Sequence, residues 1–172
     1  MKPSGDFSLR ALYEALDAQR LARGLSWAGV TREMHQAPTH SSGHRLSAST
    51  LTRTRTGRVA EGDGVLAMLR WLNRTAESFI PGCQESEEAS ARLPEIPPGK
   101  VWRFDTKKIY AALDARRLER NMSWKQVAEE IGFPASNLID LPKRTRVAFP
   151  GVMRIFRWLE RPATDFTRAS DI

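Results

Sequence analysis

The chain of 172 residues contains one cysteine, Cys83, and no long apolar run. A single cysteine excludes an intrachain disulfide and is typical of a protein kept in a reducing compartment. No stretch approaches the 18 or so consecutive apolar residues of a membrane-spanning helix, and the first ten residues lack the apolar centre of a secretory signal. We therefore expect a soluble, cytoplasmic protein with no membrane partner.

Strand patterns and catalytic signatures are also missing. No segment alternates apolar and polar residues for long enough to predict a β-strand, so the sequence predicts an all-α fold. We find no nucleophile–base pair and no phosphate-binding glycine loop, and we expect neither an enzyme nor a bound cofactor. The recurring acids Asp17 and Asp114 lie beside arginines on predicted helices, where they are expected to form ion pairs.

The chain does contain an internal duplication. The segment LYEALDAQRLARGLSW, which ends at Trp27, returns as IYAALDARRLERNMSW, which ends at Trp124, 97 positions later. A second match, between residues 51–72 and 138–159, has an offset of 87, so the first copy carries ten additional residues between Met34 and Ser47. We expect a first domain over 1–80 with an insertion at 35–46, a linker over 81–103 and a second domain over 104–172.

Basic charge is concentrated in the two copies. The first has eleven Lys/Arg against seven Asp/Glu, the second has thirteen against nine, and the linker has three against four. The linker is also rich in proline, which favours an extended spacer, and Trp102 and Phe104 are expected to dock where it ends. Two basic domains on a mildly acidic linker favour a polyanionic partner.

Each copy predicts about five short helices with matching ends. Gly24 and Asn121 occupy equivalent positions, and both residue types tolerate the left-handed conformation that ends a helix. Ser26 and Ser123 follow as N-caps of a second helix, and Gln126 completes a capping box in the second copy. In the last helix of each copy, Trp71 and Trp158 lie on the apolar stripe and are expected in the core.

The string LDARRLERNMSWKQVAEEIGFPASNL resembles the phage-repressor-like (Cro/CI, XRE-type) family of bacterial and phage DNA-binding domains. In the second copy the matching residues are Asn121, Ser123, Val127, Ala128, Gly132 and Ser136. In the first copy they are Gly24, Ser26, Val30, Ser49 and Leu51. The resemblance implies two tandem lambda-repressor-like helix-turn-helix domains that bind double-stranded DNA. The insertion removes the turn glycine of the first copy.

The resemblance implies that the third helix of each copy lies in the major groove. The groove-facing residues would be Ala48, Ser49, Thr50 and Arg53 in the first copy and Ala135, Ser136, Asn137 and Asp140 in the second. Arg53 can contact guanine and Asn137 adenine, whereas Asp140 either accepts from a cytosine amino group or repels phosphate. The basic residues that follow these helices would contact phosphates, with an ordinary solvated face as the alternative. They are Arg55, Arg58, Lys143, Arg144 and Arg146.

Two further groups allow more than one interpretation. Trp27 and Trp124 begin the second helix of each copy, where an indole can donate to a phosphate or pack over the junction with the first helix, and we favour packing. His35, His40 and His44 lie in the insertion and are weak candidates for a zinc site. Because no cysteine or acidic ligand lies nearby, a polar loop is the favoured interpretation.

The sequence thus predicts a nucleoid-associated regulator that binds an asymmetric DNA site as a covalent pseudo-dimer. Two linked domains gain from effective concentration, because binding of one holds the other near the DNA. The insertion and Asp140 motivate an alternative, in which one or both copies have become protein-interaction or dimerisation modules. The alternative implies a homo-oligomer or a protein partner.

Overall fold

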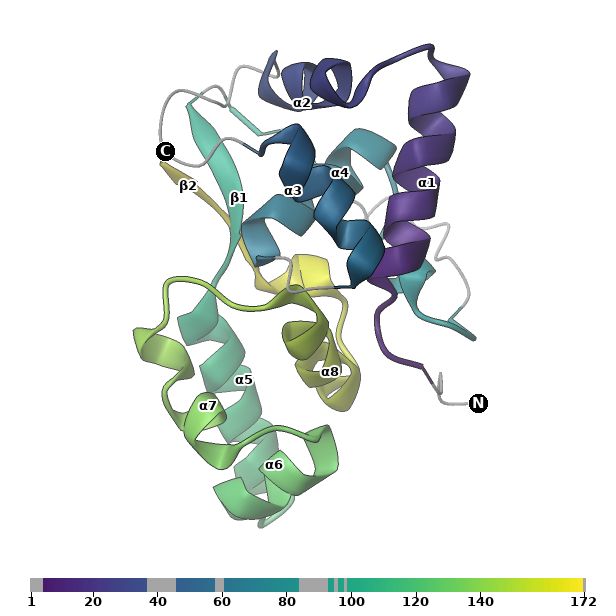
Figure 1. Cartoon of the computed structure of the whole chain (residues 1–172). Coiled ribbons are helices and arrows are strands. Elements are labelled where there is room, and N and C mark those ends of the chain that lie inside the picture. Colours follow the sequence, from purple (N-terminus) through teal and green to yellow (C-terminus); the bar gives the residue numbers. More distant parts are fainter. Residues whose placement is uncertain are drawn as a thin grey trace.

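The computed structural model describes residues 5–36, 46–57, 61–83, 93–94, 96–97 and 99–171, with side chains except at residues 35 and 36. The described residues are mostly helical and form eight α-helices and a small sheet (Figure 1). In the first copy the helices are α1 (Leu9–Ala22), α2 (Trp27–Gln36), α3 (Ala48–Arg53) and α4 (Gly62–Leu72). In the second copy they are α5 (Thr106–Glu119), α6 (Trp124–Ile131), α7 (Ala135–Ile139) and α8 (Phe149–Leu159).

The predicted helix ends are confirmed. Gly24 and Asn121 have positive φ angles of 64° and 52°, and each lies two residues after the last residue of α1 or α5. The Ser26 hydroxyl accepts from the backbone N–H of Gly29 at 3.1 Å. Both hydrogen bonds of the capping box between Ser123 and Gln126 are present at the start of α6. Short polar residues in these turns therefore fix where the second helix of each copy begins.

Short 3₁₀ turns follow the third and fourth helices of each copy. They are η1 (Thr54–Thr56), η2 (Glu77–Phe79), η4 (Leu141–Lys143) and η5 (Ala163–Phe166). The third helix of the second copy, α7, ends at Ile139, and Pro142 lies in the 3₁₀ turn η4 that follows it. Proline lacks the N–H that would continue the α-helix, which explains the change to 3₁₀ geometry.

The prediction of an all-α fold is wrong at two segments. Strand β1 (Lys100–Phe104) pairs antiparallel with β2 (Thr167–Asp171), with Lys100 opposite Asp171. Each strand spans five residues, too few to show a clear alternation, and their pairing forms only when distant segments meet. Strand β1 begins within the segment assigned to the linker, and its Phe104 is buried, as expected for a docking residue.

One apolar core runs through both copies. Phe7 of the first copy contacts Phe149 of the second, with ring centroids 4.6 Å apart. The residue equivalent to Phe7 is Phe104, and the residue equivalent to Phe149 is Gly62. These two residues are also in contact: a Cβ added to Gly62 would lie 2.8 Å from a Phe104 ring carbon. Glu61 and Ala148, which are equivalent positions, form an antiparallel bridge to each other. Reciprocal contacts of this kind define an isologous interface, so an approximate twofold rotation relates the copies.

Candidate nucleic-acid interface

The position of α3 is set by its one buried side chain and by its cap. Leu51 is fully buried in the core, while the Ser47 hydroxyl accepts from the backbone N–H of Thr50 at 3.2 Å. Because Leu51 faces inward, the opposite side of α3 presents Ser49 and Arg53 to solvent. Ala48 and Thr50 are half-buried. The structure therefore places Ser49 and Arg53, of the residues predicted to face DNA, on an open surface.

The equivalent α7 is anchored in the same way and presents different chemistry. Leu138 corresponds to Leu51 and is also fully buried. The exposed residues are Ser136 and Ile139, and the Ile139 side chain is 45% exposed although it is apolar. Ala135, Asn137 and Asp140 are half-buried. The two third helices therefore share an anchor and differ in what they expose.

The twofold relation determines how these exposed sides are arranged. A twofold rotation makes α3 and α7 equivalent and places them at the same height along its axis, related by a half-turn about it. In Figure 1, α2 and α6 lie at opposite ends, and α3 is drawn in front of α4 on the side that faces the viewer. We call the exposed residues of the two third helices, with the basic residues that follow them, the α3–α7 face.

The basic residues on the α3–α7 face differ in their partners. Among the described residues, the side chains of Arg53 and Arg55 have no hydrogen-bond or ion-pair partner. In the second copy, such partners are present for each predicted phosphate-contacting residue. Lys143 pairs with Asp140 at 3.0 Å, Arg144 donates to Asn137 Oδ1 at 2.7 Å, and Arg146 pairs with Glu61 at 3.3 Å. Asp140 is thus compensated by its own neighbour.

Trp27 and Trp124 pack over the junction of the first two helices in each copy. Trp27 stacks on Tyr13 with ring centroids 5.3 Å apart, and Trp124 stacks on Tyr110 at 5.2 Å. On each indole lies an arginine, Arg20 at 4.9 Å from the Trp27 ring and its equivalent Arg117 at 5.0 Å from the Trp124 ring. The packing interpretation is supported, because these rings are held by contacts within their own copies.

The same two arginines also account for the recurring acids. Arg20 binds Asp17, and Arg117 binds Asp114 in the equivalent geometry, with N–O distances of 2.5 and 2.6 Å. Each arginine also donates to a backbone carbonyl in the turn that follows its helix. The predicted ion pairs are confirmed, and they hold the turn between the first and second helices.

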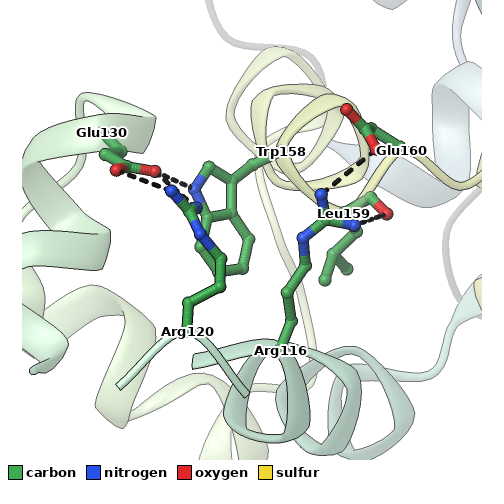
Figure 2. A network of polar contacts seen from close by, with 6 residues as sticks. All are labelled: Arg116, Arg120, Glu130, Trp158, Leu159 and Glu160. Atoms are coloured by element: carbon green, nitrogen blue, oxygen red, sulfur yellow. Dashed lines mark hydrogen bonds and ion pairs between the residues drawn. The ribbon is translucent and has the colours of Figure 1, made fainter. Parts of the chain in front are cut away.

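A second polar network, shown for the second copy in Figure 2, changes the prediction that Trp158 lies in the core. Trp158 donates its indole N–H to Glu130 at 2.7 Å, and Arg120 binds the same carboxylate. This hydrogen bond from Arg120 to Glu130 raises the pKa of the guanidinium. Trp158 is half-buried rather than part of the closed core. The apolar stripe predicted the face of α8 correctly and missed the polar contact at its edge.

The first copy repeats this arrangement. Trp71 donates to Glu33 at 3.0 Å, Arg23 pairs with the same carboxylate at 2.7 Å, and Trp71 is also half-buried. Each network ties the end of the first helix to the second and fourth helices. Since both copies keep it, the network supports the fold of each copy rather than the differences between them.

Some predicted residues lie outside the described part of the chain. They are Arg58, His40 and His44, together with the side chain of His35. Among the described residues, no group of three His, Cys, Asp or Glu side chains is placed to hold a metal ion. Within the same part of the chain, no helix combines the length and the apolar character that crossing a bilayer requires.

Sequence reasoning missed three features of the α3–α7 face. They are the exposed Ile139, the contact of Arg144 with Asn137, and the pairing of Arg146 with Glu61 of the other copy. The last two depend on how the chain folds back after Pro142, which no local pattern specifies. Searches of protein-family models, curated proteins and solved structures each returned no match for this chain.

Proposed function

We propose that the protein is a sequence-specific regulator that binds double-stranded DNA through the α3–α7 face, as a covalent pseudo-dimer on an asymmetric site. The observation that carries this proposal is the isologous contact between the copies, through Phe7 with Phe149 and Gly62 with Phe104. We infer that α3 and α7 both face along the twofold axis of this pair, which is the arrangement that lets two helix-turn-helix units meet one duplex. The resemblance to phage repressors points to the same function.

The charge distribution favours the same partner. Each copy carries a net charge of +4 by its Lys/Arg and Asp/Glu content, and the guanidinium groups of Arg53 and Arg55 are exposed. An exposed guanidinium can bind a phosphate or the two acceptors of guanine without first losing another partner. The first copy would therefore supply much of the electrostatic attraction, and the second copy would contribute groups that are already paired within the protein.

The two halves of the DNA site should differ. Position 53 in the first copy holds arginine, and the equivalent position 140 in the second holds an aspartate paired with Lys143. A protein whose two third helices differ in this way is matched by two different half-sites, about 34 Å apart if both lie on one side of the duplex. Because the interface between the copies is internal to one chain, no second chain is needed to complete the pair.

The test is selection of binding sites from random double-stranded DNA, followed by affinity measurements over a range of salt concentrations. We expect an enriched asymmetric site and a linear fall of log K with log salt, as bound cations are released from the DNA. Arg53→Ala should relax the preference at one base pair by about 1–3 kcal/mol, and Lys143→Ala should weaken all sequences alike. No enrichment over competitor DNA, or affinity that does not depend on salt, would contradict the proposal.

A protein-interaction module is the second candidate, favoured by the surface of α7. Ile139 is 45% exposed there, and the neighbouring Asp140 and Asn137 are engaged by Lys143 and Arg144. An exposed apolar residue among internally paired polar groups is better matched by a protein surface than by the phosphates of DNA. Recovery of one stoichiometric protein partner, lost with Ile139→Asp and accompanied by no DNA binding, would support this candidate over the first.

A further inference from the structure

The contact between Arg144 and Asn137 sets which base edge α7 can recognise. Asn137 is the third residue of α7, within the end that enters the major groove in the proposed complex. A free asparagine side chain offers one acceptor and one donor, which matches the edge of adenine. In this structure one of the two lone pairs of Asn137 Oδ1 is already engaged, because an Arg144 guanidinium N–H donates to it at 2.7 Å.

The orientation of the Asn137 amide follows from the chemistry of its partner. A guanidinium has five N–H donors and no acceptor, so the amide atom that faces Arg144 is the oxygen. The Nδ2 group is then directed away from Arg144 and remains available as a donor. The exposed Arg144 side chain has further N–H groups beside the occupied oxygen. The pair therefore presents donors on both sides of the Asn137 oxygen.

The backbone holds Arg144 in place for this contact. The backbone N–H of Arg144 donates to the carbonyl of Leu141 at 3.1 Å, and its own carbonyl accepts from the Thr106 hydroxyl at 3.0 Å. At the other end of the contact, the backbone N–H of Asn137 donates to the Pro134 carbonyl at 3.0 Å. Both residues are thus fixed at the backbone, one at the start of α7 and one after η4.

We infer that Arg144 is a specificity-determining residue that changes the preference of α7 from adenine to guanine. Guanine presents two acceptors, N7 and O6, in the major groove, and these match the donors of the Asn137–Arg144 pair. Adenine presents an amino donor where the pair also has donors, and cytosine presents a donor in the same region. This inference rests on the proposed function, because it concerns the same face and the same DNA.

The experiment compares base preferences at the position that α7 contacts. Wild-type protein, Arg144→Met and Lys143→Met are each used to select sites from random DNA, and affinities are then measured for guanine and adenine at that position. Lys143→Met is the matched control, since it removes one positive charge from the adjacent residue and its partner is Asp140, not Asn137. Thermal unfolding of each variant shows whether the fold is kept.

The wild-type protein should prefer guanine to adenine there by about 5- to 150-fold, the range for one paired base contact. Arg144→Met releases the Asn137 oxygen and should reverse the preference toward adenine, whereas Lys143→Met should weaken all sites and keep guanine preferred. If Arg144→Met only weakens every site equally, or if the wild type already prefers adenine, Arg144 is a phosphate contact and the inference is wrong. If the wild type selects no DNA, the inference and the proposed function both fail.

Discussion

Mild truncation of one buried phenylalanine should destabilise both copies by the same amount. Phe166 in the second copy is fully buried and stacks on Phe156, with ring centroids 4.9 Å apart. Phe79 is its equivalent in the first copy and lies edge-on to Phe7, 6.0 Å away. Phe7 in turn contacts Phe149 of the second copy, so the two sites belong to one continuous core.

Replacing Phe166 by leucine keeps an apolar side chain of similar size and removes the ring stacking. We expect a cost of about 1–2 kcal/mol, from the lost aromatic pair and imperfect packing. Phe79→Leu should cost a similar amount or slightly less, since its ring contact is longer. Both costs are below the stability of about 5–15 kcal/mol that small proteins have, so both variants should remain folded.

Native-state hydrogen exchange measures each copy separately. The slowest backbone amides of α1 report on the first copy and those of α5 on the second. We expect each variant to lower the opening free energy of both helices equally, because neither copy unfolds without the other. The reasoning would be refuted if Phe166→Leu affected α5 alone and Phe79→Leu affected α1 alone, since that pattern belongs to two independent domains.

Gly62→Ala should destabilise the protein by about 1–3 kcal/mol in a denaturant titration, because the added Cβ would lie 2.8 Å from the Phe104 ring. An unchanged midpoint of unfolding would contradict this close contact. Gly29→Gln should stabilise the protein by about 0.5–2 kcal/mol. It replaces a helical glycine and supplies the capping-box partner that Gln126 provides in the second copy. A loss of stability would show that the first copy cannot form the capping box. Burial, and then the charge of Glu77, raise the pKa of the Cys83 thiol. Alkylation of Cys83 should therefore need a higher pH in the folded protein than in urea. An equal or lower pH midpoint of alkylation in the folded protein would show that the thiol is open to solvent.

The sequence predicted those parts of the fold that short segments determine. The caps at Ser26 and Ser123, the left-handed residues Gly24 and Asn121, and the start of α6 depend on neighbours within a few positions. They recur in both copies, and the duplication made each one visible twice. The pairing of β1 with β2 was missed, because it joins residues more than sixty positions apart.

The candidate site was less accessible to sequence reasoning than the fold. The starts of the third helices at Ala48 and Ala135 were predicted correctly, and the buried Leu51 and Leu138 explain which of their residues are exposed. Which cations are paired depends on the return of the chain after Pro142 and on the contact between the copies, as in the pairing of Arg146 with Glu61. The isologous interface leaves no repeated motif in the sequence, because the two equivalent contact positions hold different residues, Gly62 in the first copy and Phe149 in the second.

In the proposed complex, the two copies form one rigid pair whose third helices bind one side of a duplex. The most direct test measures affinity for the selected DNA site after insertion of five or ten base pairs between its two half-sites. A rigid pair has a single spacing, so we predict that both insertions reduce affinity to that of one half-site, although ten base pairs restore the helical phase. Recovery of full affinity with the ten-base-pair insertion would contradict the claim, because it requires copies that move apart on a flexible linker.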